Sequence, residues 1–142
     1  MKVLIDTNVA LDFMSSREPF ATDAEKTFLL CCSDLVEAYI AANSFCDLHY
    51  VLQKYLHDEE ETRSAMMFWL DIVKIAQTSE IDCINALNSR ISDYEDAVIE
   101  SIAKRMGCEC IVTRNLKDFS NSSVPALSPE EFVLKALRSR SS

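Results

Sequence analysis

Four aspartates are placed where short apolar runs of the chain begin or end. They are Asp6, Asp47, Asp96 and Asp118. If the apolar runs are neighbouring strands of a parallel sheet, these carboxylates gather at one edge of it, where they repel each other unless a cation is bound. Ligands that are all oxygen atoms select hard ions, Mg²⁺ or Mn²⁺ rather than zinc. The spacing therefore indicates metal-assisted hydrolysis of a phosphodiester.

Three of these aspartates also have a simpler structural interpretation. Asp6 stands where a turn residue is expected, with Asn8 as the cap of a following helix. Ser44 and Asp47 are spaced like a capping box, and Asp118 fits an ordinary loop acid. The spacing alone leaves both interpretations open.

Asp96 is harder to explain by helix capping. The spacing predicts a helix over 93–106 with Ser92 as its cap and Glu95 completing the capping box, while Asp93 interacts only with the helix dipole. Because the capping roles are then filled, Asp96 is the strongest candidate for a functional acid in this segment.

Apolar runs and amphipathic stretches alternate along the chain. The predicted strands are 2–5, 39–42, 72–76, 110–113 and, as a short fifth, 124–127. The predicted helices are 20–32, 45–56, 59–70, 79–89, 93–106 and 129–137, the last with Ser128 as its cap. The strands lack polar alternation, which is typical of a parallel sheet covered by helices on both faces. We expect an α/β domain that spans residues 1–142.

Composition excludes several other classes of protein. Gly107 is the only glycine, whereas phosphate-binding loops and dinucleotide fingerprints need several. The six cysteines include no Cys-x-x-Cys pair, and we expect them to be free and mostly buried. His49 and His57, the two histidines, lack the spacing of metal ligands and are expected at the surface. No run approaches 18 apolar residues, so we expect a cytoplasmic protein without a membrane segment.

Charge is unevenly distributed along the chain, whose formal net charge is −9. Residues 101–142 carry 7 basic and 4 acidic side chains, in contrast to the acidic remainder. This excess fits either solvated helix faces or a surface that binds RNA phosphates. In the second case Arg114 and Lys117 should lie nearest the predicted acidic site.

Four segments resemble the motifs of the PIN domain, the nuclease fold of VapC-type toxins from toxin–antitoxin pairs, and they occur in that family's order. They are Val3–Asp12, Ala41–Leu52, Asp93–Ala97 and Ile111–Phe119. Val124–Phe132 is similar to the family's C-terminal segment, and Arg17–Phe20 fits its toxin-like branch. The resemblance covers nearly the whole chain.

The resemblance implies a three-layer α/β/α fold with about five parallel strands in the order 3-2-1-4-5. It also implies an endoribonuclease dependent on Mg²⁺ or Mn²⁺, the toxin of a toxin–antitoxin pair, which forms a homodimer and binds a small antitoxin. The metal-binding acids carry over to the four aspartates, with Asn8, Thr113 and Asn115 as supporting polar groups. Asp47 stands where the family most often has glutamate. A catalytically inactive PIN-like module that binds RNA or a protein is the alternative.

Overall fold

A five-stranded parallel sheet forms the centre of the molecule. The computed structural model describes residues 1–141. Its strands are β1 (Lys2–Ile5), β2 (Glu37–Ala41), β3 (Lys74–Ala76), β4 (Cys110–Val112) and β5 (Ala126–Leu127). They lie in the order β3-β2-β1-β4-β5, and every neighbouring pair is parallel. Both the α/β class and the strand order are therefore confirmed.

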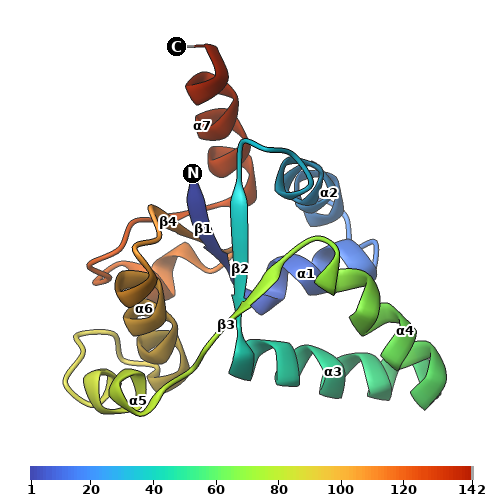
Figure 1. The fold of residues 1–142 in the computed structure, drawn as a ribbon, viewed down its shortest axis with the longest axis horizontal. Coiled ribbons are helices and arrows are strands. Elements are labelled where there is room, and N and C mark those ends of the chain that lie inside the picture. The colour runs from blue at the N-terminus through green and yellow to red at the C-terminus, as the bar shows by residue number, and fades with distance from the viewer. Residues whose placement is uncertain (142) are drawn as a thin grey trace.

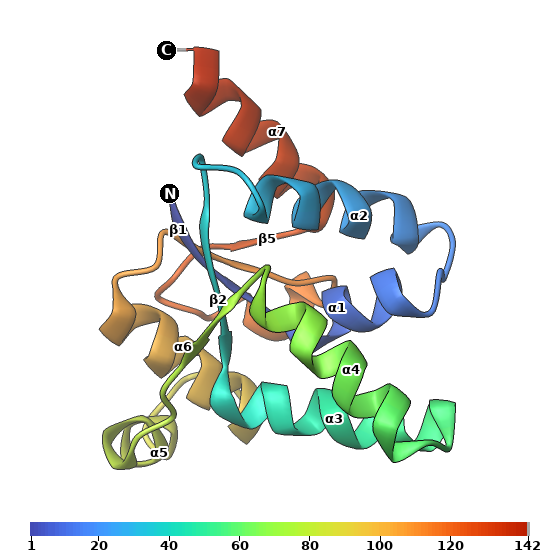
Figure 2. The same ribbon diagram turned by 45° about the vertical axis from the view of Figure 1, so that its right-hand side comes forward.

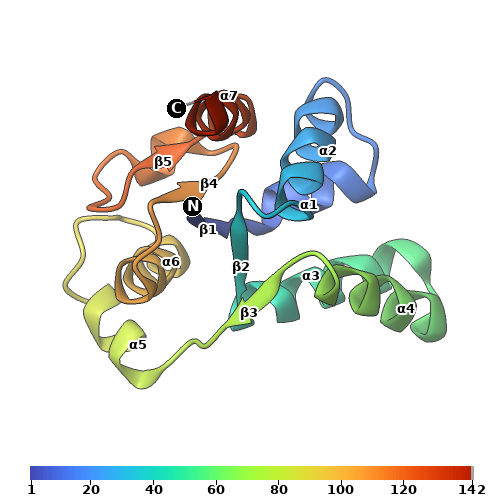
Figure 3. The ribbon, with the colours of Figure 1, turned by 45° about the horizontal axis from the view of Figure 1, so that its top comes forward.

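Helices cover both faces of this sheet. They are α1 (Thr7–Met14), α2 (Phe20–Cys31), α3 (Ala42–Leu56), α4 (Glu59–Leu70), α5 (Glu80–Ala86), α6 (Tyr94–Met106) and α7 (Pro129–Ser141), with a 3₁₀ turn η1 (Leu116–Phe119). Figures 1 and 3 show α5 and α6 on one side of the sheet and α1 to α4 on the other. None of the helices in residues 1–141 has the length and apolar character needed to span a membrane.

Two apolar cores result from the alternation of side chains along the central strand. Val3 and Ile5 pack with α1, α2, α3, α4 and α7, whereas Leu4 packs with α5, α6 and η1. All three are at most 1% exposed, which is why β1 lacks polar alternation. Asp6 therefore directly follows a strand that is buried on both faces.

Aromatic rings pack between three helices on the side of the sheet that carries α1 to α4. Phe13 of α1, Phe28 of α2 and Trp69 of α4 meet edge to face, with centroids 4.6–5.7 Å apart. Figure 2 shows these three helices gathered on the same side of the sheet. This packing holds α1 directly behind the end of β1.

A buried ion pair joins the two helices of the opposite face. Asp82 of α5 is fully buried and accepts hydrogen bonds from Arg105 of α6, Ser101 and Ser79. Although burial raises the pKa of Asp82, these bonds hold it at about 2. Asp82 also forms the predicted capping box with Ser79 at the start of α5.

Helix α1 was expected only in the turn interpretation of Asp6, and its cap differs from that expectation. Asp6 is its N-cap and accepts a 2.8 Å hydrogen bond from Thr7 N, so Asn8 lies inside the helix rather than capping it. The periodicity of the short segment from Thr7 to Met14 spans only two turns, which makes it weak as a helix signal.

The second predicted capping motif is also wrong. Helix α3 begins directly at Ala42, where β2 ends, instead of at residue 45. Ser44 and Asp47 are therefore both inside the helix, and Ala41 is the N-cap, with no side-chain hydrogen bond. Asp47 is consequently not a capping residue and lies in the second turn.

The third capping prediction is wrong by one residue. Asp93, not Ser92, is the N-cap of α6, and its carboxylate accepts a 3.0 Å hydrogen bond from Asp96 N. Glu95 accordingly completes no capping box. Gly107 ends the helix with a left-handed backbone, φ 71°.

The remaining element boundaries shift by small amounts. Strand β2 starts at Glu37, two residues early, because Glu37 pairs with Lys2. Strand β3 starts at Lys74 instead of residue 72, since Ile72 N and Val73 N still donate to Trp69 O at the end of α4. Helix α5 ends at Ala86 instead of residue 89, and α7 extends beyond residue 137.

All six cysteines are free, as predicted, but only half are buried. Cys31, Cys108 and Cys110 are buried, whereas Cys32, Cys46 and Cys83 are exposed. Burial raises the pKa of the buried thiols, that of Cys110 to about 12, so they are inert core groups.

Candidate metal-dependent active site

A hollow of about 260 Å³ lies beyond the carboxyl ends of β1 and β2, bordered by the start of α6. Its polar lining consists of Asp6, Thr7, Asn8, Asn43, Ser44, Asp47, Glu95, Asp96 and Asn115. Four of these side chains are carboxylates, and none of the described lining residues is a lysine, arginine or histidine. The hollow is therefore an anionic pocket at the edge of the sheet where sites of parallel α/β folds form.

Asp6 is the most firmly held of the acids. Its Oδ2 accepts hydrogen bonds from Thr113 Oγ1 at 2.9 Å and Asn8 Nδ2 at 3.3 Å, while Oδ1 accepts from Thr7 N. Burial raises the pKa of Asp6, as do the charges of Asp118 and Asp93, and the bonds from Thr113 and Thr7 oppose that rise. Asp6 is thus a fixed carboxylate under repulsion from other acids.

Thr113 and Asn8 extend this network behind Asp6. Thr113 is fully buried, and its hydroxyl accepts from Asn8 Nδ2 at 3.2 Å and from Asn115 N at 3.0 Å. Asn8 Oδ1 in turn accepts from Arg114 N at 3.2 Å. The residues expected to support the site therefore join α1 to the loop after β4. Asn115 also lines the hollow, whereas Thr113 is not among its lining residues.

Asp96 carries the clearest sign of crowded negative charge. It lies in the first turn of α6 and lines the hollow. Its pKa rises to about 7, first because it is partly buried and then because Asp6, Asp93 and Asp118 repel its ionised form. Such a shift at a pocket is typical of a functional site, and a bound cation would reverse it.

Asp47 shares the lining of the hollow with Glu95, which the spacing predicts as a capping residue. The charge of Asp47 is the largest cause of the raised pKa of Glu95, followed by burial. Both side chains belong to exposed residues of the lining. The signal that could have identified Glu95 is its position beside Asp96, in a run of three acids within four residues.

Asp118 stands apart from the other three predicted aspartates. It is exposed on η1 and is not among the lining residues of the hollow, although its charge raises the pKa of both Asp6 and Asp96. The structure therefore brings Asp6, Asp47 and Asp96 together around one space and leaves Asp118 near its rim.

Neither predicted RNA-binding side chain lines the acidic hollow. Arg114 Nε donates a 2.8 Å hydrogen bond to Asp12, a buried acid of α1, and the guanidinium stacks 4.4 Å from the centroid of Phe20. Lys117 is exposed on η1. Arg114 thus has a structural partner, and RNA contact by either residue stays a prediction.

The chemistry of the lining fits a hard divalent cation. The carboxylates and amides offer oxygen ligands only, which Mg²⁺ and Mn²⁺ prefer. Among residues 1–141, however, no three Asp, Glu, His or Cys side chains stand close enough together to hold an ion as placed. The lining acids that could hold such an ion are Asp6, Asp47, Asp96 and Glu95.

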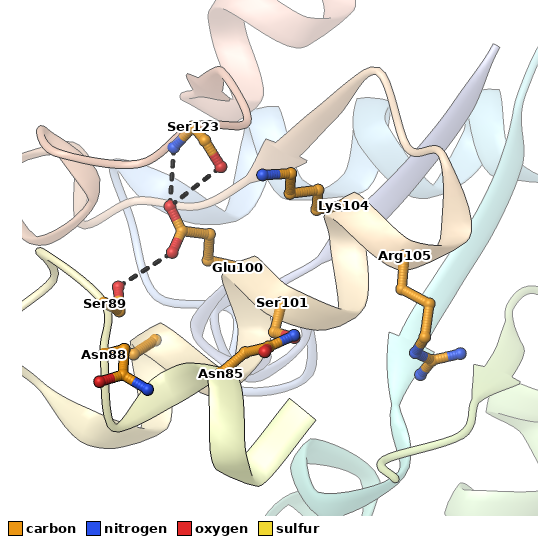
Figure 4. A pocket seen from close by; sticks show the side chains of 9 residues that line it. Asn85, Asn88, Ser89, Glu100, Ser101, Lys104, Arg105 and Ser123 are labelled. Atoms are coloured by element: carbon orange, nitrogen blue, oxygen red, sulfur yellow. Dashed lines mark hydrogen bonds between the residues drawn. The ribbon is translucent and has the colours of Figure 1, made fainter. Parts of the chain in front are cut away.

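A second hollow, of about 380 Å³, lies between α5 and α6 and does not share this chemistry. Figure 4 shows its one carboxylate among the described lining residues, Glu100, bonded to Ser89 and Ser123. Lys104 and Arg105 also contribute to its wall. With its acid already paired, this hollow lacks the crowded carboxylates of the first.

The comparisons with known proteins agree with this architecture. A family model described as PIN domain matches residues 2–117, and the chain belongs to this family. VapBC2 from Rickettsia felis, solved bound to a DNA fragment from its promoter, contains a similar chain with a TM-score of 0.72 and 18% identity, covering 90% of this chain and 98% of that one.

Two further solved structures are similar. A toxin–antitoxin complex from Klebsiella pneumoniae has a TM-score of 0.65 and 25% identity, with 89% of this chain and 97% of that chain covered. The sarcin–ricin loop cleaving toxin VapC20 from Mycobacterium tuberculosis has a TM-score of 0.60 and 10% identity, with coverages of 77% and 86%. A search of the curated proteins returned no match.

Proposed function

We propose that this protein is an endoribonuclease dependent on Mg²⁺ or Mn²⁺ that hydrolyses RNA phosphodiester bonds. The observation that carries the proposal is the meeting of Asp6, Asp47 and Asp96, from three distant segments, around one anionic hollow. The raised pKa of Asp96, about 7, is the electrostatic sign of that crowding. A structural role for these acids would not require three segments to place like charges together.

The proposal includes a role as the toxin of a type II toxin–antitoxin pair that acts in the cytoplasm. Support comes from the similar structures, among which are toxin–antitoxin complexes and a toxin that cleaves the sarcin–ricin loop. We expect a small antitoxin protein as the partner, and a homodimer as the state of the toxin. The single domain, taken to span residues 1–142, is part of the same proposal.

In this proposal the residues of the hollow have different roles. Asp6, Asp47, Asp96 and Glu95 would hold the ion, and Asp118 would add negative charge near the rim. A divalent ion held there would polarise a water molecule and would offset charge on the phosphate oxygens. Thr113 fixes the orientation of Asp6 through its hydrogen bond. Because no histidine lines the hollow among the described residues, no serine–histidine nucleophile is expected there.

The chemistry of the product ends tests this mechanism. Water attack leaves a 5′-phosphate and a 3′-hydroxyl, whereas attack by the RNA 2′-hydroxyl leaves a 2′,3′-cyclic phosphate. We expect 5′-phosphate ends, cleavage of a substrate with 2′-deoxyribose at the scissile position, and complete inhibition by EDTA. Cyclic phosphate ends, or cleavage that persists in EDTA, would refute the mechanism.

One observation favours the alternative of an inactive PIN-like module that binds RNA or protein. Asp47 is one methylene shorter than the glutamate that the family motif most often carries, and it is exposed at the hollow. A side chain that is too short to reach the ion would leave binding without hydrolysis. RNA retention on a filter together with no cleavage at saturating Mn²⁺ would establish this alternative.

A further inference from the structure

Asn43 brings a neutral hydrogen-bonding group into a hollow dominated by carboxylates. It is the second residue of α3, directly beyond β2, and it lines the hollow together with Asp6, Asp47 and Asp96. An RNA phosphate entering this space meets repulsion from each acid, and an amide N–H is one of the few groups there that could attract it. Asn8, another lining amide, already donates to Asp6 and Thr113.

The hydroxyl of Thr78 determines which end of the Asn43 amide is engaged. Thr78 Oγ1 accepts from Asn43 N at 3.4 Å, which supplies the helix cap that Ala41 cannot provide. The hydroxyl proton is then directed to Asn43 Oδ1, at 2.8 Å. With its oxygen engaged by Thr78, Asn43 offers its Nδ2 as a hydrogen-bond donor.

The residues on both sides of Thr78 are hydrogen-bonded to the ion pair of Asp82 and Arg105. Arg105 donates to Gln77 O, and Asp82 accepts from Ser79 N at 2.9 Å. The residues before and after Thr78 are therefore both anchored to the α5–α6 unit. This arrangement positions the Thr78 hydroxyl over the start of α3, although the two residues are 35 positions apart.

We propose that Asn43 Nδ2 donates a hydrogen bond to a phosphate oxygen of RNA bound in this hollow, and that Thr78 is the positioning residue that orients it. The inference rests on the proposed ribonuclease function and adds a substrate contact to it. The contact is made by a neutral group, so it attracts the phosphate without competing with the acids for the ion. Because it binds RNA before and during cleavage alike, its loss should appear mainly in KM.

The test is a double-mutant cycle measured on RNA cleavage. Steady-state kcat and KM are determined in saturating Mn²⁺ with a short, fluorescently labelled single-stranded RNA of randomised sequence. We expect Asn43→Ala to raise KM about 10-fold, the loss of one hydrogen bond to a charged group, with a smaller change in kcat. Thr78→Val should raise KM in the same direction, and Thr78→Ser, which keeps the hydroxyl, should restore it.

The double-mutant cycle tests whether Thr78 acts on RNA binding through Asn43 or only supports the fold. Since Thr78 acts on RNA through Asn43, adding Thr78→Val to Asn43→Ala should change KM no further. Multiplying effects would show that the two residues act independently and would overturn the proposal. Asn88→Ala, in the second hollow, is the matched control and should leave KM unchanged. Thermal unfolding of each variant reports any loss of the helix cap.

Two other outcomes would also overturn the proposal. An unchanged KM in Asn43→Ala would mean that the amide does not contact RNA. A higher Mn²⁺ concentration for half-maximal activity, with KM for RNA unchanged, would make Asn43 a metal ligand instead. If the wild-type protein cleaves no RNA in Mn²⁺, the proposed function itself fails, which is distinguishable from an active enzyme that is insensitive to Asn43→Ala.

Discussion

The hydroxyl of Thr113 donates a 2.9 Å hydrogen bond to Asp6 Oδ2, although the two residues are 107 positions apart. The parallel pairing of β1 with β4 makes this contact possible, because Asp6 N also donates to Val112 O at 2.9 Å. The register of two strands thus fixes the orientation of the central acid. A charge-assisted bond of this kind is stronger than a neutral one.

We therefore predict that Thr113→Val lowers Mn²⁺-dependent cleavage about 10-fold, a loss typical of one hydrogen bond to a charged group. The two side chains have nearly the same shape, so no cavity is left, but the bonds that Asn8 Nδ2 and Asn115 N donate to the hydroxyl are lost as well. Thr113→Ser keeps the hydroxyl and should retain most of the activity. The measurement is kcat/KM for the same RNA. Equal activity of Thr113→Val and the wild type would show that the hydrogen bond from Thr113 to Asp6 is not needed for cleavage.

The raised pKa of Asp96 predicts a pH-dependent stability in EDTA. The folded-state pKa of about 7 lies above the ordinary value of 3.8, so the proton-linked stabilisation is complete below pH 4 and is lost as the pH rises through 7. Asp96→Asn removes the ionising group. We expect the variant to be more stable than the wild type by about 2 kcal/mol at pH 8, with the difference vanishing near pH 4.

Urea unfolding at these two pH values, with EDTA present, measures the difference. Asp71→Asn, an exposed acid at the end of α4, is the control and should show no comparable gain at pH 8. An Asp96→Asn protein that is less stable than the wild type at pH 8 would show that the acids of the hollow do not repel each other.

Substitutions of Asp47 test whether this acid is a metal ligand. Its position in the second turn of α3 excludes the capping role. We predict that Asp47→Ala lowers cleavage about 100-fold, as loss of metal-assisted catalysis does, while Asp47→Glu preserves or raises it. Cleavage rates over a Mn²⁺ titration measure both effects. Wild-type activity in Asp47→Ala would exclude it from the site.

Alanine variants of Arg114 and Lys117 should differ in their free energy of unfolding even if both residues bind RNA. Arg114→Ala leaves the buried Asp12 carboxylate without its ion-pair partner, which we expect to lower the free energy of unfolding by about 2–3 kcal/mol. Lys117→Ala should leave stability unchanged, since the side chain is exposed. If each residue contacts a phosphate, each alanine variant lowers the salt slope of RNA binding by about 1.

Chemical denaturation and RNA titration at several salt concentrations measure these quantities. The same slope in wild type and Lys117→Ala would exclude η1 from the RNA-binding surface. An unchanged unfolding free energy for Arg114→Ala would show that its ion pair with Asp12 contributes nothing.

The sheet was predictable because its strands are buried on both faces and therefore read as uninterrupted apolar runs. Val3, Leu4 and Ile5 illustrate this, since neighbouring residues enter different cores. The order of the strands came from the resemblance to the PIN domain, because apolar runs by themselves do not specify neighbours. Helix α4 was predicted at its observed bounds, since the acidic run before it favours a helix N-terminus.

The parts that could not be predicted depend on geometry that spacing does not encode. A capping box and a run of acids look alike in sequence, so the spacing favoured Ser92 as the cap and Glu95 as its capping-box partner. In the structure Asp93 is the cap, and Glu95 lines the hollow. The Thr78–Asn43 contact joins residues from different segments and leaves no local pattern. The ion pair of Arg114 with Asp12 is likewise a tertiary feature.

The most direct test of the central claim compares RNA cleavage by the wild-type protein and Asp6→Asn over a Mn²⁺ titration. Asp6→Asn removes one negative charge from the hollow without changing the shape of the side chain, so the fold should be kept or stabilised. The account predicts Mn²⁺-dependent cleavage by the wild type and its loss in Asp6→Asn, with both proteins folded by circular dichroism. Full Mn²⁺-dependent cleavage by Asp6→Asn would contradict it.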